Sequence, residues 1–239
     1  MEQPGILRKA EERGYADHGW LKTHYSFSFA NYFDSAHMGW GNLRVINDDI
    51  IAPGGGFGKH PHRDMEILTY VLSGKIAHED SMGNIKTIPA GSVQRMSAGK
   101  GIFHSEFNPS KEESTHLLQI WILPTKKGIE PSYEQKDIST ELKSGRLCLI
   151  ASPEGTKEGL SLHTQAKVYA GLFHGGQKAQ LSFPSSSKAY VHLVAGELRV
   201  NGQPLHSGDA LKLEKLDQIT LTEGKLAEVL VFELSAESI

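Results

Sequence analysis

Cysteine is almost absent from this 239-residue chain, in which Cys148 is the single example. An internal disulfide is therefore impossible, and the stability of the fold must come from a packed core. No apolar run approaches the roughly 18 residues that span a bilayer. The first segment, Met1 to Tyr15, is polar and charged and lacks the apolar centre of a signal peptide. These absences predict a cytoplasmic protein that has no membrane partner.

An excess of basic charge is also missing. Lys and Arg total 25 against 28 Asp and Glu, a formal net charge of −3, and the mean hydropathy is −0.34. A protein that binds nucleic acid usually presents a basic surface. The composition therefore predicts a globular protein without direct nucleic-acid binding, and its length suits one large domain or two small ones.

Helical periodicity is scarce, whereas glycine is abundant, with 25 residues where the usual share is about 7%. Short apolar and β-branched runs recur between turn-forming residues, at 43–46, 66–72, 117–123, 147–151, 190–194 and 229–234. Many short strands separated by turns predict an all-β barrel or sandwich. Short helices are expected only over Lys136 to Lys143 and in one turn near Leu7 to Arg13.

Two segments of the chain resemble each other. Residues 69–93 and 191–211 both show an apolar strand, a glycine, a second strand, a turn and another glycine before a third strand. A duplication would give this pattern, although two unrelated hairpins would give it too. Residues 125–141 are polar and contain Pro131, as a linker would. We therefore predict two antiparallel β-barrels packed side by side, formed by residues 1–130 and 131–239.

Two short motifs contain residues that bind metals. They are His60-Pro61-His62 and His104-Ser105-Glu106. Because side chains alternate between the two faces of a strand, the outer residues of each motif should point the same way. Two such strands in one barrel could bring four ligand atoms to one point. Neutral imidazoles and a carboxylate suit Fe, Mn, Co, Ni, Cu or Zn.

The glycines around these motifs add specificity. Five residues separate Gly54 from His60, and three separate His62 from Glu66, as in the first signature motif of the cupin superfamily. Asn108 follows His104 after three residues, as in the second signature. The match is not complete, since Gly99 stands where the second signature has proline.

A closer resemblance is to the bacterial pirins, a cupin family of which several members are described as quercetin 2,3-dioxygenases. It is carried by HGWLKTHYSFSFANY from residue 18, LRVINDD from 43, GFGKHPHRDMEILTYVLSG from 56, HEDSMGN from 78 and QRMSAGKGIFHSEFN from 94. The resemblance implies an all-β bicupin of jelly-roll type. Its metal site lies in the N-terminal cupin, and the C-terminal cupin has none.

The resemblance also implies one divalent transition metal per chain, held by three histidines and one glutamate. These positions correspond here to His60, His62, His104 and Glu106. Iron(II) is the expected metal, with Zn, Ni, Co, Mn or Cu as alternatives. Glu66 competes with Glu106 for the fourth position because many cupins place a ligand there. We favour Glu106, and Glu66 would then either orient an imidazole or serve a purely structural role.

Other side chains are weaker candidates. Phe57, Met96 and Phe103 could line a pocket over the metal, although aromatic and methionine side chains are more often plain core residues. His78 lies next to Ser81 to Asn84, which are typical of a hairpin tip, so no metal role is expected for it.

Three functions fit these residues. The first is a dioxygenase that cleaves the central ring of a flavonol with O2 and releases carbon monoxide, with Glu106 as the base that takes the proton of the substrate hydroxyl. The second is a non-enzymatic, iron-dependent redox sensor and transcriptional cofactor, as animal pirins are described. The third is a metal-dependent cupin enzyme that acts on a different small molecule. The ligand set alone does not separate them, and the absence of a nuclear-type Lys/Arg cluster favours the first.

Overall fold

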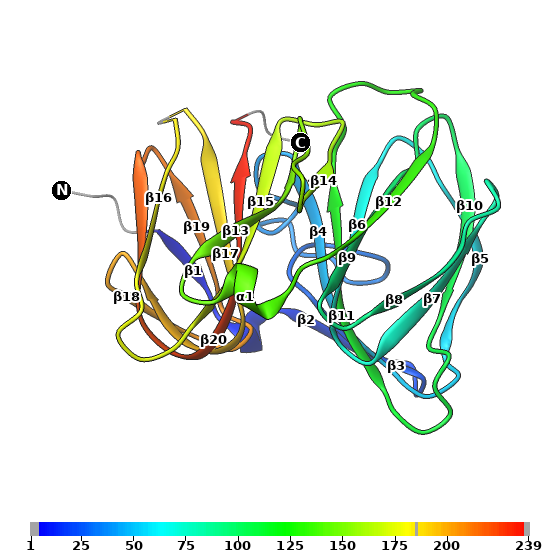
Figure 1. The fold of residues 1–239 in the computed structure, drawn as a ribbon, viewed down its shortest axis with the longest axis horizontal. Helices are drawn as coiled ribbons and strands as arrows, with labels where there is room; N and C mark the ends of the chain where they lie inside the picture. The colour runs from blue at the N-terminus through cyan, green and yellow to red at the C-terminus, as the bar shows by residue number, and fades with distance from the viewer. Residues whose placement is uncertain (1–4, 185, 237–239) are drawn as a thin grey trace.

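A computed structural model describes residues 5–184 and 186–236, which form two β-rich halves side by side (Figure 1). Helix within these residues is limited to the 3-10 turn Ala10–Glu12 and to α1, Thr140–Lys143. Both lie inside the segments predicted to be helical, but Lys136 and Asp137 belong to a strand instead. No helix in the described part of the chain is both long and apolar enough to cross a membrane.

The first half consists of two sheets. The larger has seven strands, in the order β12 (Ser132–Asp137), β9 (Ser92–Ser97), β6 (Glu66–Ser73), β11 (Thr115–Ile122), β4 (Leu43–Ile51), β3 (Leu21–Tyr25) and β2 (Gly14–Asp17). The smaller has four, in the order β5 (Gly56–His62), β10 (Ile102–Phe107), β7 (Lys75–Asp80) and β8 (Ile85–Pro89). All the pairings within these two sheets are antiparallel.

The second half is built on one sheet. Its main path runs β1 (Ile6–Arg8), β19 (Ala210–Glu214), β17 (Lys188–Val200), β20 (Gln218–Leu234), β15 (Ala166–Phe173), β13 (Leu147–Ser152) and β14 (Leu160–Ser161), with β16 (Ala179–Ser182) on β20 and β18 (Gln203–His206) on β17. The pairing of β17 with β20 shifts register three times. At one shift Gly196 has φ +78°, and an added Cβ would meet the Leu226 carbonyl oxygen. Such bulges let the two long strands bend around a core.

The central strands β6 and β11 of the seven-stranded sheet are buried on both faces for most of their length, which explains their continuous apolar stretches. In β6, Leu68 and Tyr70 face the second half, where they join a cluster that includes Tyr190 and Phe232. The alternate residues face the four-stranded sheet, where Val71 packs with Ile76 in a separate cluster. The interface between the halves is therefore a hydrophobic core in its own right.

The prediction of an all-β protein with two packed halves is confirmed, although hydrogen bonding does not close either half into a barrel. The jelly-roll layers of the first half are two open sheets, and those of the second half belong to one open sheet. The boundary after residue 130 stays a prediction. Near it, β12 pairs with β9 of the first half, and at the start of the chain β1 pairs with β19 of the second.

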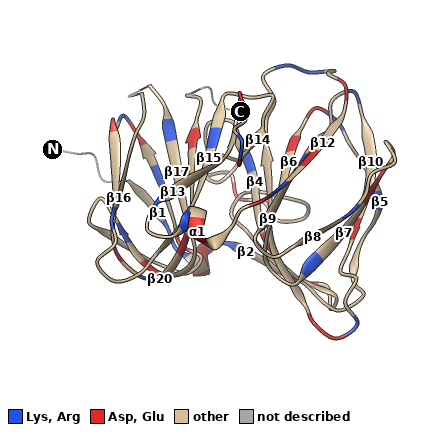
Figure 2. Ribbon diagram, viewed as in Figure 1, with Lys and Arg blue, Asp and Glu red and all other residues tan. Residues whose placement is uncertain are grey.

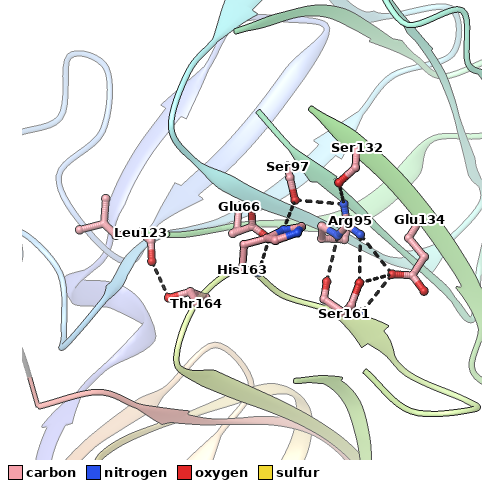
Figure 3. Close-up of polar contacts among 9 residues, drawn as sticks. All are labelled: Glu66, Arg95, Ser97, Leu123, Ser132, Glu134, Ser161, His163 and Thr164. Carbon is pink, nitrogen blue, oxygen red and sulfur yellow. Dashed lines mark hydrogen bonds and ion pairs between the residues drawn. The ribbon is translucent and has the colours of Figure 1, made fainter. Parts of the chain in front are cut away.

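Polar contacts also join the halves, and one of them links Arg95 in β9 to Ser161 in β14, within a network of contacts that Arg95 makes (Figure 3). Arg95 is 3% exposed, and its guanidinium donates to the Ser161 carbonyl oxygen at 3.0 Å and pairs with the Glu134 carboxylate at 3.2 Å. It also donates to the hydroxyls of Ser97 and Ser132. Elsewhere acidic and basic residues are interspersed over both halves (Figure 2).

Candidate metal centre

Two neighbouring strands bring three histidines together. His60 and His62 lie on β5, and the register places His104 of β10 opposite His60. The three imidazole ring centroids are 4.4 to 4.9 Å apart. One ring nitrogen from each lies within 4.8 Å of the other two. Strand alternation predicted that His60 and His62 point the same way, and the pairing of β5 with β10 brings His104 to them.

The three rings are suited to hold a metal ion. Nδ1 of His60 and the Gly58 carbonyl oxygen are 2.7 Å apart, so Nδ1 donates there and Nε2 keeps its lone pair. His104 is 2% exposed, and neither of its ring nitrogens has a hydrogen-bond partner. Burial, aided by the neighbouring histidines, lowers the pKa of His104 to about 2, and burial lowers that of His62 to about 4. Both rings are therefore neutral at pH 7, the form that binds metals.

Glu106 lies on the same face of β10 as His104, as its spacing predicted. Its carboxylate is 2% exposed and accepts three hydrogen bonds. Gln119 Nε2 donates to Oε2 at 2.6 Å, while Thr69 Oγ1 and Gln94 Nε2 donate to Oε1 at 3.3 and 3.4 Å. Burial raises the pKa of Glu106 to about 7 against the lowering effect of the Thr69 and Gln119 hydrogen bonds.

These donors belong to one polar row that crosses the seven-stranded sheet. Asn47 on β4 pairs with Gln119 on β11, which pairs with Thr69 on β6, which pairs with Gln94 on β9. All four side chains are buried. Each of the four strands therefore contributes one buried polar residue to a row that lies next to the Glu106 carboxylate. This row was not predicted, because its members are dispersed over distant parts of the chain.

His78 also belongs to the site and was missed. The register of β7 places it opposite Glu106, and its ring centroid lies 5.3 Å from that of His104. Its Nε2 is 3.1 Å from Asp80 Oδ2, and burial lowers its pKa. The signal was present, because Ile76, His78 and Asp80 share the buried face of a strand that continues to Asp80.

Two overlapping groups of possible ligands therefore exist among the described residues. The first is His60, His62 and His104, and the second is His78, His104 and Glu106. His104 is common to both, and the four predicted ligands do not all meet the 4.8 Å limit together. Both groups lie in the first half, and the described residues of the second half supply no such group.

Glu66 lies on the other side of the sheet from this site. An even number of positions separates it from His62, so strand alternation carried on unbroken from β5 would turn it toward the site. The chain turns between β5 and β6, with Asp64 at φ +49°, so the alternation does not carry across. Glu66 faces the second half instead, where its carboxylate accepts a hydrogen bond from the His163 backbone N–H at 3.1 Å (Figure 3). Its position fits the structural role rather than the orientation of an imidazole.

A cavity of about 210 Å³ opens over the histidines. Its lining residues are Phe29, Asn47, Asp49, Phe57, His60, His62, Ile67, His104, Glu106, Gln119 and Trp121. Phe57 is thus at the pocket, as predicted. Met96 is instead fully buried beside Ile102, and Phe103 is 48% exposed on the opposite face of β10, so neither lines the cavity.

The arrangement combines neutral imidazoles, one buried carboxylate and an apolar, aromatic wall. Trp121 packs edge-on against His62, with ring centroids 4.8 Å apart. Such a cavity can hold an aromatic molecule against a metal ion and provide a carboxylate that accepts a proton.

Comparison with known proteins gives consistent matches over the two halves. The pirin family model matches residues 7–122, and the model of the quercetinase C-terminal cupin domain matches residues 149–234. A quercetin 2,3-dioxygenase of Escherichia coli strain K12 is 44% identical over 228 residues, which cover 95% of this chain and 97% of the relative. A pirin-like protein of Caulobacter vibrioides is 40% identical over 93% of this chain and 96% of its own length.

Among solved structures, the bacterial pirin YhhW of Escherichia coli in complex with nickel(II) superimposes with a TM-score of 0.92 at 43% identity. The match covers 97% of this chain and 99% of YhhW. A quercetin 2,3-dioxygenase of Acinetobacter baumannii, at 22% identity and a TM-score of 0.76, shares the fold.

Proposed function

The chain belongs to the pirin family, and from that premise we propose that it is a metal-dependent dioxygenase that opens the central ring of a flavonol with O2 and releases carbon monoxide. One observation carries the proposal. The three-histidine cluster and the Glu106 carboxylate line the same aromatic-walled cavity. Relatives named as quercetin 2,3-dioxygenases, at 44% identity, support the substrate class.

The residues that would hold one divalent metal ion are His60, His62, His104 and Glu106. The unpartnered ring nitrogens of His104 and the His60 hydrogen bond to Gly58 support this ligand set. When bound, the metal supplies Lewis acidity that stabilises the oxyanion of a deprotonated substrate hydroxyl. Iron(II) is the metal proposed, and the nickel(II) in the related structure supports divalent binding in general.

Glu106 is proposed as the base that takes the proton of the 3-hydroxyl. A flavonol must lose this proton before it can donate electrons toward O2. Oε2 is anchored by the short hydrogen bond from Gln119, whereas Oε1 has two longer ones. Together these hydrogen bonds hold the carboxylate in place at the cavity, as a general base requires.

The walls of the cavity orient the substrate and exclude water. Phe29 and Trp121 pack edge to face, with ring centroids 5.2 Å apart, and Phe57 packs in the same way against Trp20 at 5.0 Å. Flat aromatic rings pack well against such surfaces. A polyphenol would thus be seated with its metal-binding oxygens toward the histidines.

Oxygen uptake and carbon monoxide release test the proposal. Protein purified without chelator is analysed for metal, and metal-free protein is reloaded with iron(II) under nitrogen. Quercetin is then added in an oxygen electrode, and carbon monoxide is trapped with deoxyhaemoglobin. We expect one CO released for each O2 consumed. Oxygen uptake no faster than quercetin autoxidation without enzyme would reject the activity.

A further inference from the structure

A second cavity adjoins the one over the histidines. It measures about 270 Å³, and four residues, Phe29, Asn47, Asp49 and Phe57, line both cavities. Its remaining wall comes mainly from the β3 region, including Trp20, Thr23 and Tyr25. Each cavity alone falls short of the roughly 300 Å³ at which ligand sites usually begin. A ligand that occupies both has enough room.

Asp49 stands where the two cavities meet, and one of its oxygens lacks a donor. The residue is 2% exposed, and its Oδ1 is buried without a hydrogen bond. Its neighbours across the sheet are Thr23 and Leu117, and the Thr23 hydroxyl is near enough to act on the carboxylate but is outside the distance and angle of an ordinary hydrogen bond. A buried acceptor without a donor is costly. The preceding residue, Asp48, is fully paired by contrast, because its carboxylate contacts Arg13 at 3.2 Å and His116 at 2.6 Å.

A second unpartnered oxygen lies on the same face of β4. Asn47 is 5% exposed, lines both cavities, and its Oδ1 has no hydrogen-bond donor. Two buried acceptors along one cavity wall are positioned to accept hydrogen bonds from the donors of a bound ligand. Asp49 belongs to neither group of possible metal ligands. The wall therefore fits hydroxyl groups rather than a second metal ion.

We propose that Asp49 is a specificity-determining residue that accepts a hydrogen bond from a phenolic hydroxyl remote from the metal-binding end of the substrate. The substrate class is then a polyhydroxylated flavonol whose rings extend from the histidines into the second cavity. This inference rests on the proposed function, since it assumes a flavonol over the histidines. Burial, against the lowering effect of the neighbouring Thr23 hydroxyl, also raises the pKa of Asp49 to about 7, so its carboxyl can carry a proton and donate as well as accept.

Equilibrium binding of two flavonols tests the inference without turnover. Quercetin carries hydroxyls on its outer rings, whereas 3-hydroxyflavone keeps only the metal-binding 3-hydroxyl and 4-carbonyl. Dissociation constants are measured under nitrogen on the iron(II)-loaded protein. We expect the wild type to bind quercetin at least ~10-fold more tightly, the discrimination that a site built for a hydroxyl can supply. Asp49→Leu, which has the same number of side-chain heavy atoms, should bring the two constants within ~3-fold of each other, because the carboxyl proposed to recognise the remote hydroxyl is then absent.

Further variants guard against misfolding and unspecific effects. Asp49→Ala removes both oxygens without adding bulk and should lose the same preference, whereas Asp49→Asn keeps an acceptor and should retain most of it. Asp217→Asn, at an exposed aspartate of the second half, is the control and should bind as the wild type does. A wild type without preference, or a folded Asp49→Leu or Asp49→Ala protein that keeps it, would overturn the inference. Failure of the proposed function is seen separately, as absent oxygen uptake with quercetin.

Discussion

The carboxylate of Glu66 accepts the backbone N–H of His163 at 3.1 Å, and it lies 3.5 Å from that residue's Nδ1. The two residues are 97 positions apart and belong to different halves of the protein. Glu66 is 1% exposed, so the contact is made inside the interface. A residue at a cupin ligand position of the sequence therefore helps to join the two halves.

Removing this carboxylate should weaken the fold and spare the metal. In Glu66→Ala, the His163 N–H loses its buried acceptor, which should lower the free energy of unfolding by about 1–3 kcal/mol. Chemical denaturation measures the change, and metal analysis should give the wild-type content. Glu113→Ala, at an exposed position, is the control. A loss of metal with unchanged stability would contradict this structural role and identify Glu66 as a metal ligand.

Substitution of the clustered histidines should reduce metal binding. His60→Ala and His104→Ala each remove one of three converging imidazoles, so metal content should fall sharply while the circular dichroism spectrum stays that of a β-protein. The fold should persist because the cores on either side of the site are apolar and contain no metal ligand. His206→Ala, at an exposed histidine, is the control. Full metal content in both cluster variants would contradict the ligand set.

The variant Glu106→Gln removes the basic carboxylate from the cavity and keeps the shape of the side chain. The amide keeps an oxygen in the cavity but cannot take a proton from the substrate. Much of the metal should remain, and turnover of quercetin should fall by ~10²-fold or more, the usual contribution of a general base. Glu79→Gln, on the exposed face of β7, is the matched control. Wild-type turnover in the metal-loaded Glu106→Gln protein would remove Glu106 from this role.

The pH dependence of stability should report the buried Asp49. Burial raises its folded-state pKa from 3.8 to about 7. Between these values the unfolded chain releases a proton that the folded protein retains, so stability falls as pH rises, by about 1.4 kcal/mol per unit for one group. The amide that replaces this carboxyl in the variant Asp49→Asn cannot titrate.

The free energy of unfolding of metal-free Asp49→Asn, minus that of the wild type, should therefore increase from pH 4 to pH 7 by about 2–4 kcal/mol. Denaturation by urea at several pH values measures this difference. Asp217→Asn shows what the same substitution does at an exposed carboxyl. A difference for Asp49→Asn that does not change with pH would mean that the carboxyl is already ionised in the folded state at pH 4.

The sequence by itself determined the fold class, the family and the local orientation of the main site residues. Strand alternation alone predicted that His60 and His62 share one face of their strand and that His104 and Glu106 share one face of theirs. The prediction works because each pair lies within a single uninterrupted strand. The resemblance to the pirins is confirmed by the family matches, and both groups of possible metal ligands among the described residues lie in the first half, where that resemblance predicts the site. These inferences hold because they depend on residues close together in the chain.

The tertiary structure decided what depends on contacts between strands. The turn at Asp64 resets the alternation, so only the folded chain shows that Glu66 faces the second half. His78 joins the site through its register opposite Glu106, and the row from Asn47 to Gln94 forms only when four strands pair. Asp49 gains its place between two cavities in the same way. Sequence spacing carries no record of register between distant strands, because register is set by how the whole sheet packs.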